Sequence, residues 1–193
     1  MARRGGSESE REIPASAAAI VDLLNSRPHG NIASTLLDTL RERESASVVL
    51  RPFGQPEGVA PSSERIAEFR ALRATLMSLV AAPDGGAEAT ATLAELTERA
   101  SPVTWRHDFS VPGAVELKQV EGDPVIGGFT LAVAELMADG TFARIRACAN
   151  ERCGHVFYDS TRSRTQRWHS YETCGNRNNV AAYRARRKAG PES

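Results

Sequence analysis

Three cysteines and one histidine near the C-terminal end of the chain have the chemistry and the spacing of a zinc site. Cys148 and Cys153 are five residues apart, His169 and Cys174 are also five residues apart, and 15 residues separate the two pairs. Zinc in structural sites takes four sulfur or nitrogen ligands in a tetrahedron, and a complete set leaves no position for a substrate. The sequence therefore predicts a structural Zn²⁺ site with these four ligands.

Two neighbouring residues bear on this ligand set. Gly154 directly follows the second cysteine, where a tight ligand-bearing turn needs a residue free to adopt an unusual backbone conformation. His155 is the rival nitrogen ligand, but it lies only two residues from Cys153, so we rank it behind His169. Ordinary buried cysteines are the competing interpretation. The clustering of all three cysteines within 27 residues favours the metal site.

This region resembles the CGNR zinc finger. Residues 174–177 spell Cys-Gly-Asn-Arg, Arg167-Trp168 precede them, and Phe157-Tyr158-Asp159 follow the first pair of cysteines. The family usually carries a fourth cysteine after the Arg-Trp pair, and this chain has His169 there, which is still a competent zinc ligand. A knuckle, a short hairpin and a helix beginning near Cys174 give residues 144–188 a treble-clef-like order. We expect Trp168 to pack over the zinc site, and a base-stacking platform is its alternative role.

Charge divides the chain at the same boundary. Residues 144–188 hold eleven Arg/Lys and three Asp/Glu, whereas residues 1–143 hold thirteen and twenty. A basic module after an acidic body favours a polyanionic partner, so we expect nucleic acid, and duplex DNA in particular. Arginines would contact phosphates first, and Asn or Arg at the helix start could contact base edges. The candidate contact residues are Arg162, Arg164, Arg167, Asn176, Arg177, Arg184, Arg186, Arg187 and Lys188.

Several alternatives stay open for this module. Arg177 could instead brace the finger by pairing with Asp159 or Glu172, and RNA cannot be distinguished from DNA as the partner. A hypothesis from another class is a protein-interaction module, in which the basic finger docks on an acidic protein surface such as the body of a second copy.

The residues before the finger predict a mainly helical body with one β-hairpin, and hence an α+β fold class. Apolar residues at helical spacing indicate helices at 17–25, 31–40, 62–82, 89–100 and 123–137, with the charged residues of the longest one facing solvent. Alternation on either side of Pro112-Gly113 indicates a hairpin, and a weaker pattern predicts short strands at 47–53 and 141–147. Gly127 and Gly128 either allow close packing or delay the start of the last helix.

The body resembles the alanine-rich ABATE domain, which precedes the CGNR finger in its family. The resemblance rests on Val21–Ser26, on Phe69–Arg73 in the long helix, and on the order of hairpin, helix and Phe-x-Arg-Ile-Arg-x-Cys strand. It implies a transcription regulator linked to stress. We place a disordered tail at 1–15, the ABATE-like domain at 16–143, the finger at 144–188 and a tail at 189–193.

The body would then sense a small-molecule effector or mediate association, including homo-oligomerisation. Asp22, Asn25, Arg70 and Arg73 are the candidate pocket residues. The competing interpretation for Asp22 and Asn25 is hydrogen bonding at the end of the first helix.

Other function classes find little support in the sequence. The chain has no run of about 18 apolar residues, which a membrane helix requires, and no apolar stretch follows the N-terminal charges. An odd cysteine count argues against a disulfide framework, so we expect a cytoplasmic protein. No Gly-rich phosphate loop or Ser-His-Asp spacing is legible, and we expect no enzymatic activity.

Overall fold

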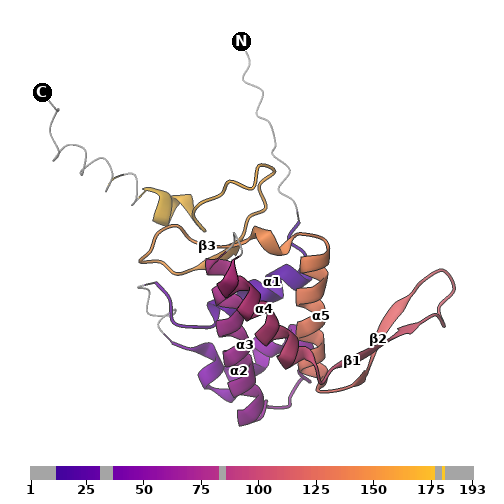
Figure 1. Ribbon diagram of the computed structural model, residues 1–193. Helices are drawn as coiled ribbons and strands as arrows, with labels where there is room; N and C mark the ends of the chain where they lie inside the picture. The colour runs from indigo at the N-terminus through magenta and orange to yellow at the C-terminus, as the bar shows by residue number, and fades with distance from the viewer. Residues whose placement is uncertain (1–11, 31–36, 83–85, 177–179, 181–193) are drawn as a thin grey trace, which may run out of the picture.

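The computed structural model describes residues 12–30, 37–82, 86–176 and 180 (Figure 1). It contains a mainly helical body, two small hairpins and a C-terminal cluster of Cys and His, which confirms the predicted α+β class. In chain order the elements are α1 Ala15–Asn25, η2 Thr39–Arg41, α2 Arg43–Leu50, η3 Arg51–Phe53, α3 Ser63–Ala81, α4 Ala87–Ala100, β1 Thr104–Asp108, β2 Glu116–Glu121, α5 Pro124–Ala138, η4 Phe142–Arg144, β3 Ile145–Ala147, β4 Val156–Tyr158 and η5 Tyr171–Gly175. No helix among these residues is long and apolar enough to cross a membrane.

The core of the body is built where α1, α3 and α5 meet η3. The rings of Phe53, Phe69 and Phe129 form a triangle with centroid distances of 5.6–5.8 Å. Gly128 makes this approach possible, because a Cβ there would lie 2.3 Å from the carbonyl oxygen of Phe53. The glycines of α5 therefore serve close packing, the first of the two predicted alternatives.

Capping side chains mark the starts of the two helices predicted at 62–82 and 123–137. The Ser62 hydroxyl accepts a hydrogen bond from the Arg65 backbone N–H at the start of α3. The Asp123 carboxylate accepts from the N–H groups of Val125 and Ile126 at the start of α5, with Pro124 in the first turn. Capping side chains satisfy amide groups that the helix itself leaves unpaired, which fixes where each helix starts.

The predicted strand at 47–53 is wrong. This segment forms the end of α2 and the 3₁₀ turn η3, with Ala46, Leu50 and Phe53 buried at helical spacing and Val48 63% exposed. The β-prone residue types are outweighed by burial against the neighbouring helices, since strand propensity depends strongly on context.

Two further elements differ from expectation. Only Ile145–Ala147 of the predicted strand at 141–147 is extended, because η4 occupies Phe142–Arg144. The predicted helix at 31–40 falls largely outside the described residues, and its described end is the 3₁₀ turn η2 rather than an α-helix.

The first hairpin matches its prediction. Strands β1 and β2 pair antiparallel, and the Ala114 N–H donates to the Val111 carbonyl at 3.2 Å across Pro112-Gly113. Gly113 has φ +80°, as the third residue of a type II turn requires. In Figure 1 this hairpin extends away from the helices.

The second hairpin joins the C-terminal region to the body. Strands β3 and β4 pair antiparallel and pack on α3 and α1, respectively (Figure 1). Ile145 and Val156, 4% and 0% exposed, belong to the same apolar cluster as the buried residues of the helices. The residues of the zinc region therefore share one core with the body.

Candidate zinc site

The four predicted ligands come together in space. The ligand atoms of Cys148, Cys153, His169 and Cys174 all lie within 4.8 Å of one another, although the chain between the first and last spans β4 and a long loop. Nδ1 of His169 lies 3.3 Å from Sγ of Cys153 and 3.7 Å from Sγ of Cys174. Zinc bonds of about 2.0–2.3 Å in a tetrahedron separate ligand atoms by roughly 3.3–3.8 Å, so these distances suit one zinc ion.

The first two ligands lie on a knuckle that follows β3. The Cys148 N–H donates to the His155 carbonyl and the Cys153 N–H to the Asn150 carbonyl, each at 2.8 Å. Gly154 turns the chain with φ +65°, the left-handed conformation that the sequence led us to expect there. Together these bonds point both thiols to the same side.

The last two ligands flank the start of η5. Ser170 caps this π-helical turn by accepting from the Thr173 N–H, so His169 lies just before the turn and Cys174 within it. The helical segment therefore begins at Tyr171, and the prediction that it begins near Cys174 is wrong by three residues. A wider five-residue turn brings Cys174 back toward His169, which a regular α-helix at this spacing would not do.

Metal binding at these buried thiols is coupled to the release of their protons. Burial, together with the neighbouring thiols of Cys148 and Cys174, raises the pKa of Cys153 to about 12. Zinc binds the thiolate, so its binding must release this proton. The Asn150 side-chain amide donates to Sγ of Cys174 at 3.5 Å, an interaction that favours the charged form of the ligand.

His155 takes part in a layer behind the ligands. Its Nδ1 lies 3.1 Å from Nε2 of His29 and its Nε2 lies 3.5 Å from Nδ2 of Asn25, so both ring nitrogens face residues of the body. Its ring contacts that of His169 with centroids 4.4 Å apart. Burial and the nearby His169, His29 and Arg27 lower the pKa of His155 to about 4, and it is neutral at physiological pH. The ring nitrogens of His155 thus face the body, whereas Nδ1 of His169 faces the thiols.

Three residues at and just after the end of α1 hold the knuckle from the body side. The Asn25 side chain donates to the Val156 carbonyl and accepts from the Val156 N–H, both at 2.8 Å. Arg27 donates to the Gly154 carbonyl, and His29 contacts His155 as described above. We did not foresee these partners, because no spacing in the sequence links residues 25–29 to the finger.

A loop rich in arginine, residues 160–167, connects β4 to the second ligand pair. The side chain of Asp159, which is 0% exposed, fixes the conformation of this loop through hydrogen bonds. The carboxylate accepts from the N–H and hydroxyl of Thr161, from the N–H of Gln166 at 3.0 Å, and from Arg146 at 3.4 Å. Burial alone would raise the pKa of Asp159, but these hydrogen bonds hold it below its ordinary value. The alternative pairing of Arg177 with Asp159 or Glu172 involves a residue outside the described part of the chain.

The finger's arginines divide into two groups. Arg144 is 3% exposed and donates to the carbonyls of Asp159 and Thr161, while Arg146 binds Asp159 and the Arg164 carbonyl, so both stabilise the loop. The predicted nucleic-acid contacts that the structure describes are all exposed: Arg162, Arg164, Arg167 and Asn176. The others, Arg177, Arg184, Arg186, Arg187 and Lys188, lie outside the described residues.

Trp168 packs half-buried beside this loop. Its ring meets that of Tyr171 edge to face, with centroids 6.0 Å apart, and the Arg167 guanidinium lies 5.3 Å from the indole centroid. Base stacking on Trp168 would require Arg167 to move, so the position is more consistent with a packing role.

The four candidate pocket residues have different surroundings. Asn25 is engaged with Val156, and Asp22 lies exposed on α1. Arg73 is only 7% exposed, contrary to the expectation that charged residues of α3 face solvent, and both it and Arg70 bind Asp38 at 2.8–3.0 Å. Ligand binding by these residues stays a prediction.

Comparison with known protein families supports the metal site. Residues 144–187 match the family model of the CGNR zinc finger. No curated protein matches the chain. The residues present thus define a zinc-binding finger with Cys148, Cys153, His169 and Cys174 positioned to hold the ion.

Proposed function

We propose that this chain is a zinc-dependent nucleic-acid-binding protein whose partner is duplex DNA. The observation that supports this most is the exposed group of Arg162, Arg164 and Arg167 on one loop beside the zinc site. None of the three forms an ion pair with a carboxylate in the described part of the chain. Arginines without acidic partners are free to contact phosphates, and a loop held by Asp159 presents them at little cost in ordering.

The zinc ion has a structural role in this proposal. Four protein ligands complete its coordination and leave no open position, so the proposed function involves no catalysis. The ion would hold the knuckle, the arginine loop and η5 in one arrangement. Asn176, exposed directly after η5, is the described residue best suited to contact a base edge.

The proposed biological role is transcription regulation, with the helical body sensing an effector or mediating association. This part rests on the resemblance of the body to the ABATE domain. Docking of the basic finger on an acidic protein and binding to RNA are the competing functions, and a titration against all three kinds of partner distinguishes them.

The test is a fluorescence titration of the full zinc-loaded chain against duplex DNA, an RNA hairpin and polyglutamate at several salt concentrations. The parent should bind duplex DNA, and the triple variant Arg162→Ala/Arg164→Ala/Arg167→Ala should bind more weakly on every sequence. Its log–log salt slope should fall by about 0.9 for each arginine–phosphate interaction that the substitutions remove.

The matched control is Arg41→Ala/Arg43→Ala/Arg51→Ala, which removes the same charge from exposed positions on the body. It should leave the affinity and the salt slope close to those of the parent. Equal losses of affinity in both triple variants would mean that only net charge matters, and would overturn the assignment of the loop. Binding to polyglutamate without binding to either nucleic acid would overturn the proposal in favour of an acidic protein partner.

A further inference from the structure

Toward its tip, one face of the hairpin of β1 and β2 carries apolar side chains that the described body leaves exposed. Register places Trp105 opposite Gln119 and His107 opposite Leu117, so these side chains share a face with Phe109 and Val115. Phe109, Val115 and Leu117 are 72%, 57% and 45% exposed. A lone two-stranded hairpin is marginally stable in water, and a contiguous apolar surface of this kind marks an interaction site.

The opposite face carries charge in an unusual arrangement. Arg106 lies directly opposite Lys118, and Asp108 lies directly opposite Glu116, so both cross-strand pairs have like charges. Such pairs destabilise a hairpin, and the diagonal ion pair between Lys118 and Asp108 offsets them only in part. Arg106 and Lys118 thus form a positive row across the hairpin, and Asp108 and Glu116 form a negative row beside it. A second copy rotated by 180° would place its negative row against the positive row of the first.

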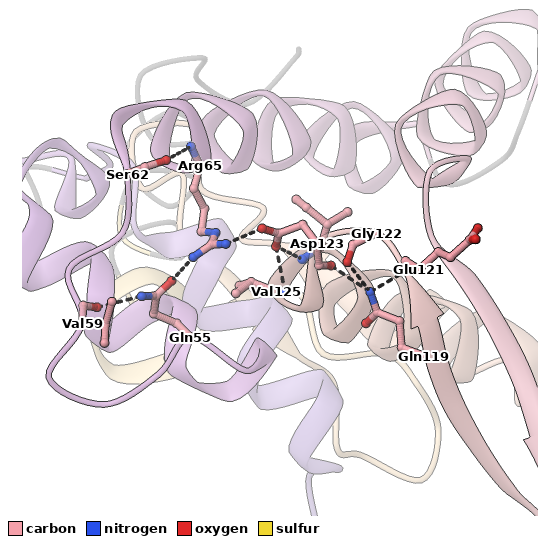
Figure 2. Close-up of polar contacts among 10 residues, drawn as sticks. Gln55, Val59, Ser62, Arg65, Gln119, Glu121, Gly122, Asp123 and Val125 are labelled. Atoms are coloured by element: carbon pink, nitrogen blue, oxygen red, sulfur yellow. Dashed lines mark hydrogen bonds and ion pairs between the residues drawn. The ribbon is translucent and has the colours of Figure 1, made fainter.

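The base of the hairpin is fixed to the body (Figure 2). The Gln119 side-chain amide donates to the carbonyls of Glu121, Gly122 and Asp123 at 3.0–3.1 Å. Asp123 caps α5 and binds Arg65 of α3, and Arg65 also donates to Gln55 at 2.9 Å. The hairpin is thus anchored to two helices, which sets the direction in which it projects.

We propose that β1 is the association surface for a second copy of this chain. Two β1 strands would pair antiparallel about a two-fold axis through His107 and form a four-stranded sheet. In that register Arg106 faces Asp108 of the second copy, and Trp105 faces its Phe109. Each contact occurs twice, which gives two ion pairs and two aromatic pairs across a closed, symmetric interface.

The outer edge of β2 fits a second copy less well. The corresponding axis through Leu117 would oppose Glu116 with Lys118, but it would place Val115 against Gln119, whose side chain is already bonded at the hairpin base. The β1 register also leaves the arginine loop free, because the hairpin precedes α5 and the finger follows it. The 15 residues of α5 separate them by roughly 22 Å.

Charge exchange tests the proposed pairing. Arg106→Asp and Asp108→Arg each create like-charge contacts across the two-fold axis, and each should weaken dimerisation by roughly tenfold or more in sedimentation equilibrium. The double variant Arg106→Asp/Asp108→Arg should dimerise again. A mixture of the two single variants should form a heterodimer, because the remaining charges then complement one another. Arg41→Asp is the control, with the charge change on an exposed residue of the 3₁₀ turn η2.

A cysteine at the axis tests the register directly. His107→Cys would place two cysteines opposite each other within disulfide reach, and oxidation of the zinc-loaded protein should give a covalent dimer. Leu117→Cys, on the other strand, should not. A chain that is monomeric at all micromolar concentrations would overturn the proposal, as would single charge variants that dimerise like the parent. Efficient cross-linking through Leu117→Cys alone would assign the interface to β2 and equally overturn it.

Discussion

The side-chain amide of Asn25 and the backbone of Val156 exchange two hydrogen bonds, each 2.8 Å long. Asn25 thereby occupies the place that a third strand would take beside β4, although it belongs to the end of α1. Val156 is fully buried and lies three residues after the ligand Cys153. This contact ties the position of the zinc knuckle to the first helix of the body.

Replacing Asn25 by Ala should destabilise the fold. The change leaves the N–H and C=O of buried Val156 without partners, which costs about 1–3 kcal/mol. Urea unfolding measures the decrease, and zinc release to a chelator should become faster. Asp22→Ala, an exposed change one turn earlier, is the control and should alter stability by less than about 0.5 kcal/mol. Equal effects of the two changes would show that the bonds to Val156 are unimportant.

Removal of zinc should lower the stability of the helical body as well as of the finger. Ile145 and Val156 of the zinc region are part of the common core, so loss of the metal loosens packing around α1 and α3. We expect one zinc per chain, and a lower melting temperature of the helical circular-dichroism signal after chelation. Identical melting with and without metal would contradict this coupling.

Single substitutions separate ligands from supporting residues in the same experiment. Cys153→Ala and His169→Ala should lose the metal, since three remaining ligands bind zinc more weakly. His155→Ala should retain about one zinc per chain, because its ring nitrogens face His29 and Asn25. Metal loss in the His155 variant, with retention in the His169 variant, would reverse the assignment.

The zinc ligands could be predicted because few residue types bind zinc and their spacing is restricted. The long helix α3 and the turn at Pro112-Gly113 were equally legible, since periodicity and turn chemistry act over neighbouring residues. Helix α2 could not be predicted in the same way. It has only eight residues, and its conformation depends on which of its side chains the neighbouring helices bury. Asn25 and Val156 are 131 positions apart, and no local pattern could have indicated their contact.

The ion pair of Arg73 with Asp38 could not be predicted either, because the two residues are far apart in the sequence. The Arg73 guanidinium makes two bonds of 2.8 Å to the carboxylate of Asp38, 35 positions earlier, and a third to the Ser26 hydroxyl. The hydrogen bonds from Arg73 hold the pKa of Asp38 below its ordinary value of 3.8. The stabilisation is therefore fully present above pH 3.8 and is lost as the pH falls through the lower pKa of the folded protein.

Asp38→Asn should remove this acid-dependent part of the stability. At neutral pH it should also cost about 3–5 kcal/mol, because Arg73 is left buried without its counter-charge. Urea unfolding at a series of pH values measures both effects. The control is Glu98→Gln, which removes one negative charge from an exposed position on α4. If the free energy of unfolding falls with pH in the same way in the parent and in the Asp38→Asn variant, the pairing with Arg73 is not the source of the acid-dependent stability.

The last prediction concerns Asp159. This buried carboxylate orders the arginine loop through hydrogen bonds within the chain and is not itself a proposed contact with DNA. Asp159→Asn removes the charge that Arg146 binds and weakens the bonds from Thr161 and Gln166, so the finger should lose about 1.5–3 kcal/mol of stability. Zinc content should stay at one per chain, because none of the four ligands changes. If the loop contacts phosphates, affinity for duplex DNA should fall while the salt slope stays constant, since all three arginines remain.

That combination distinguishes loss of loop order from loss of charge. The triple arginine variant lowers both the affinity and the salt slope, whereas Asp159→Asn should lower the affinity alone. Glu151→Gln, an exposed acidic residue on the knuckle, is the matched control and should leave stability and affinity near those of the parent. An Asp159→Asn protein as stable as the parent would show that the buried carboxylate does not organise the loop. Full stability loss with unchanged DNA affinity would place the DNA contacts elsewhere on the chain.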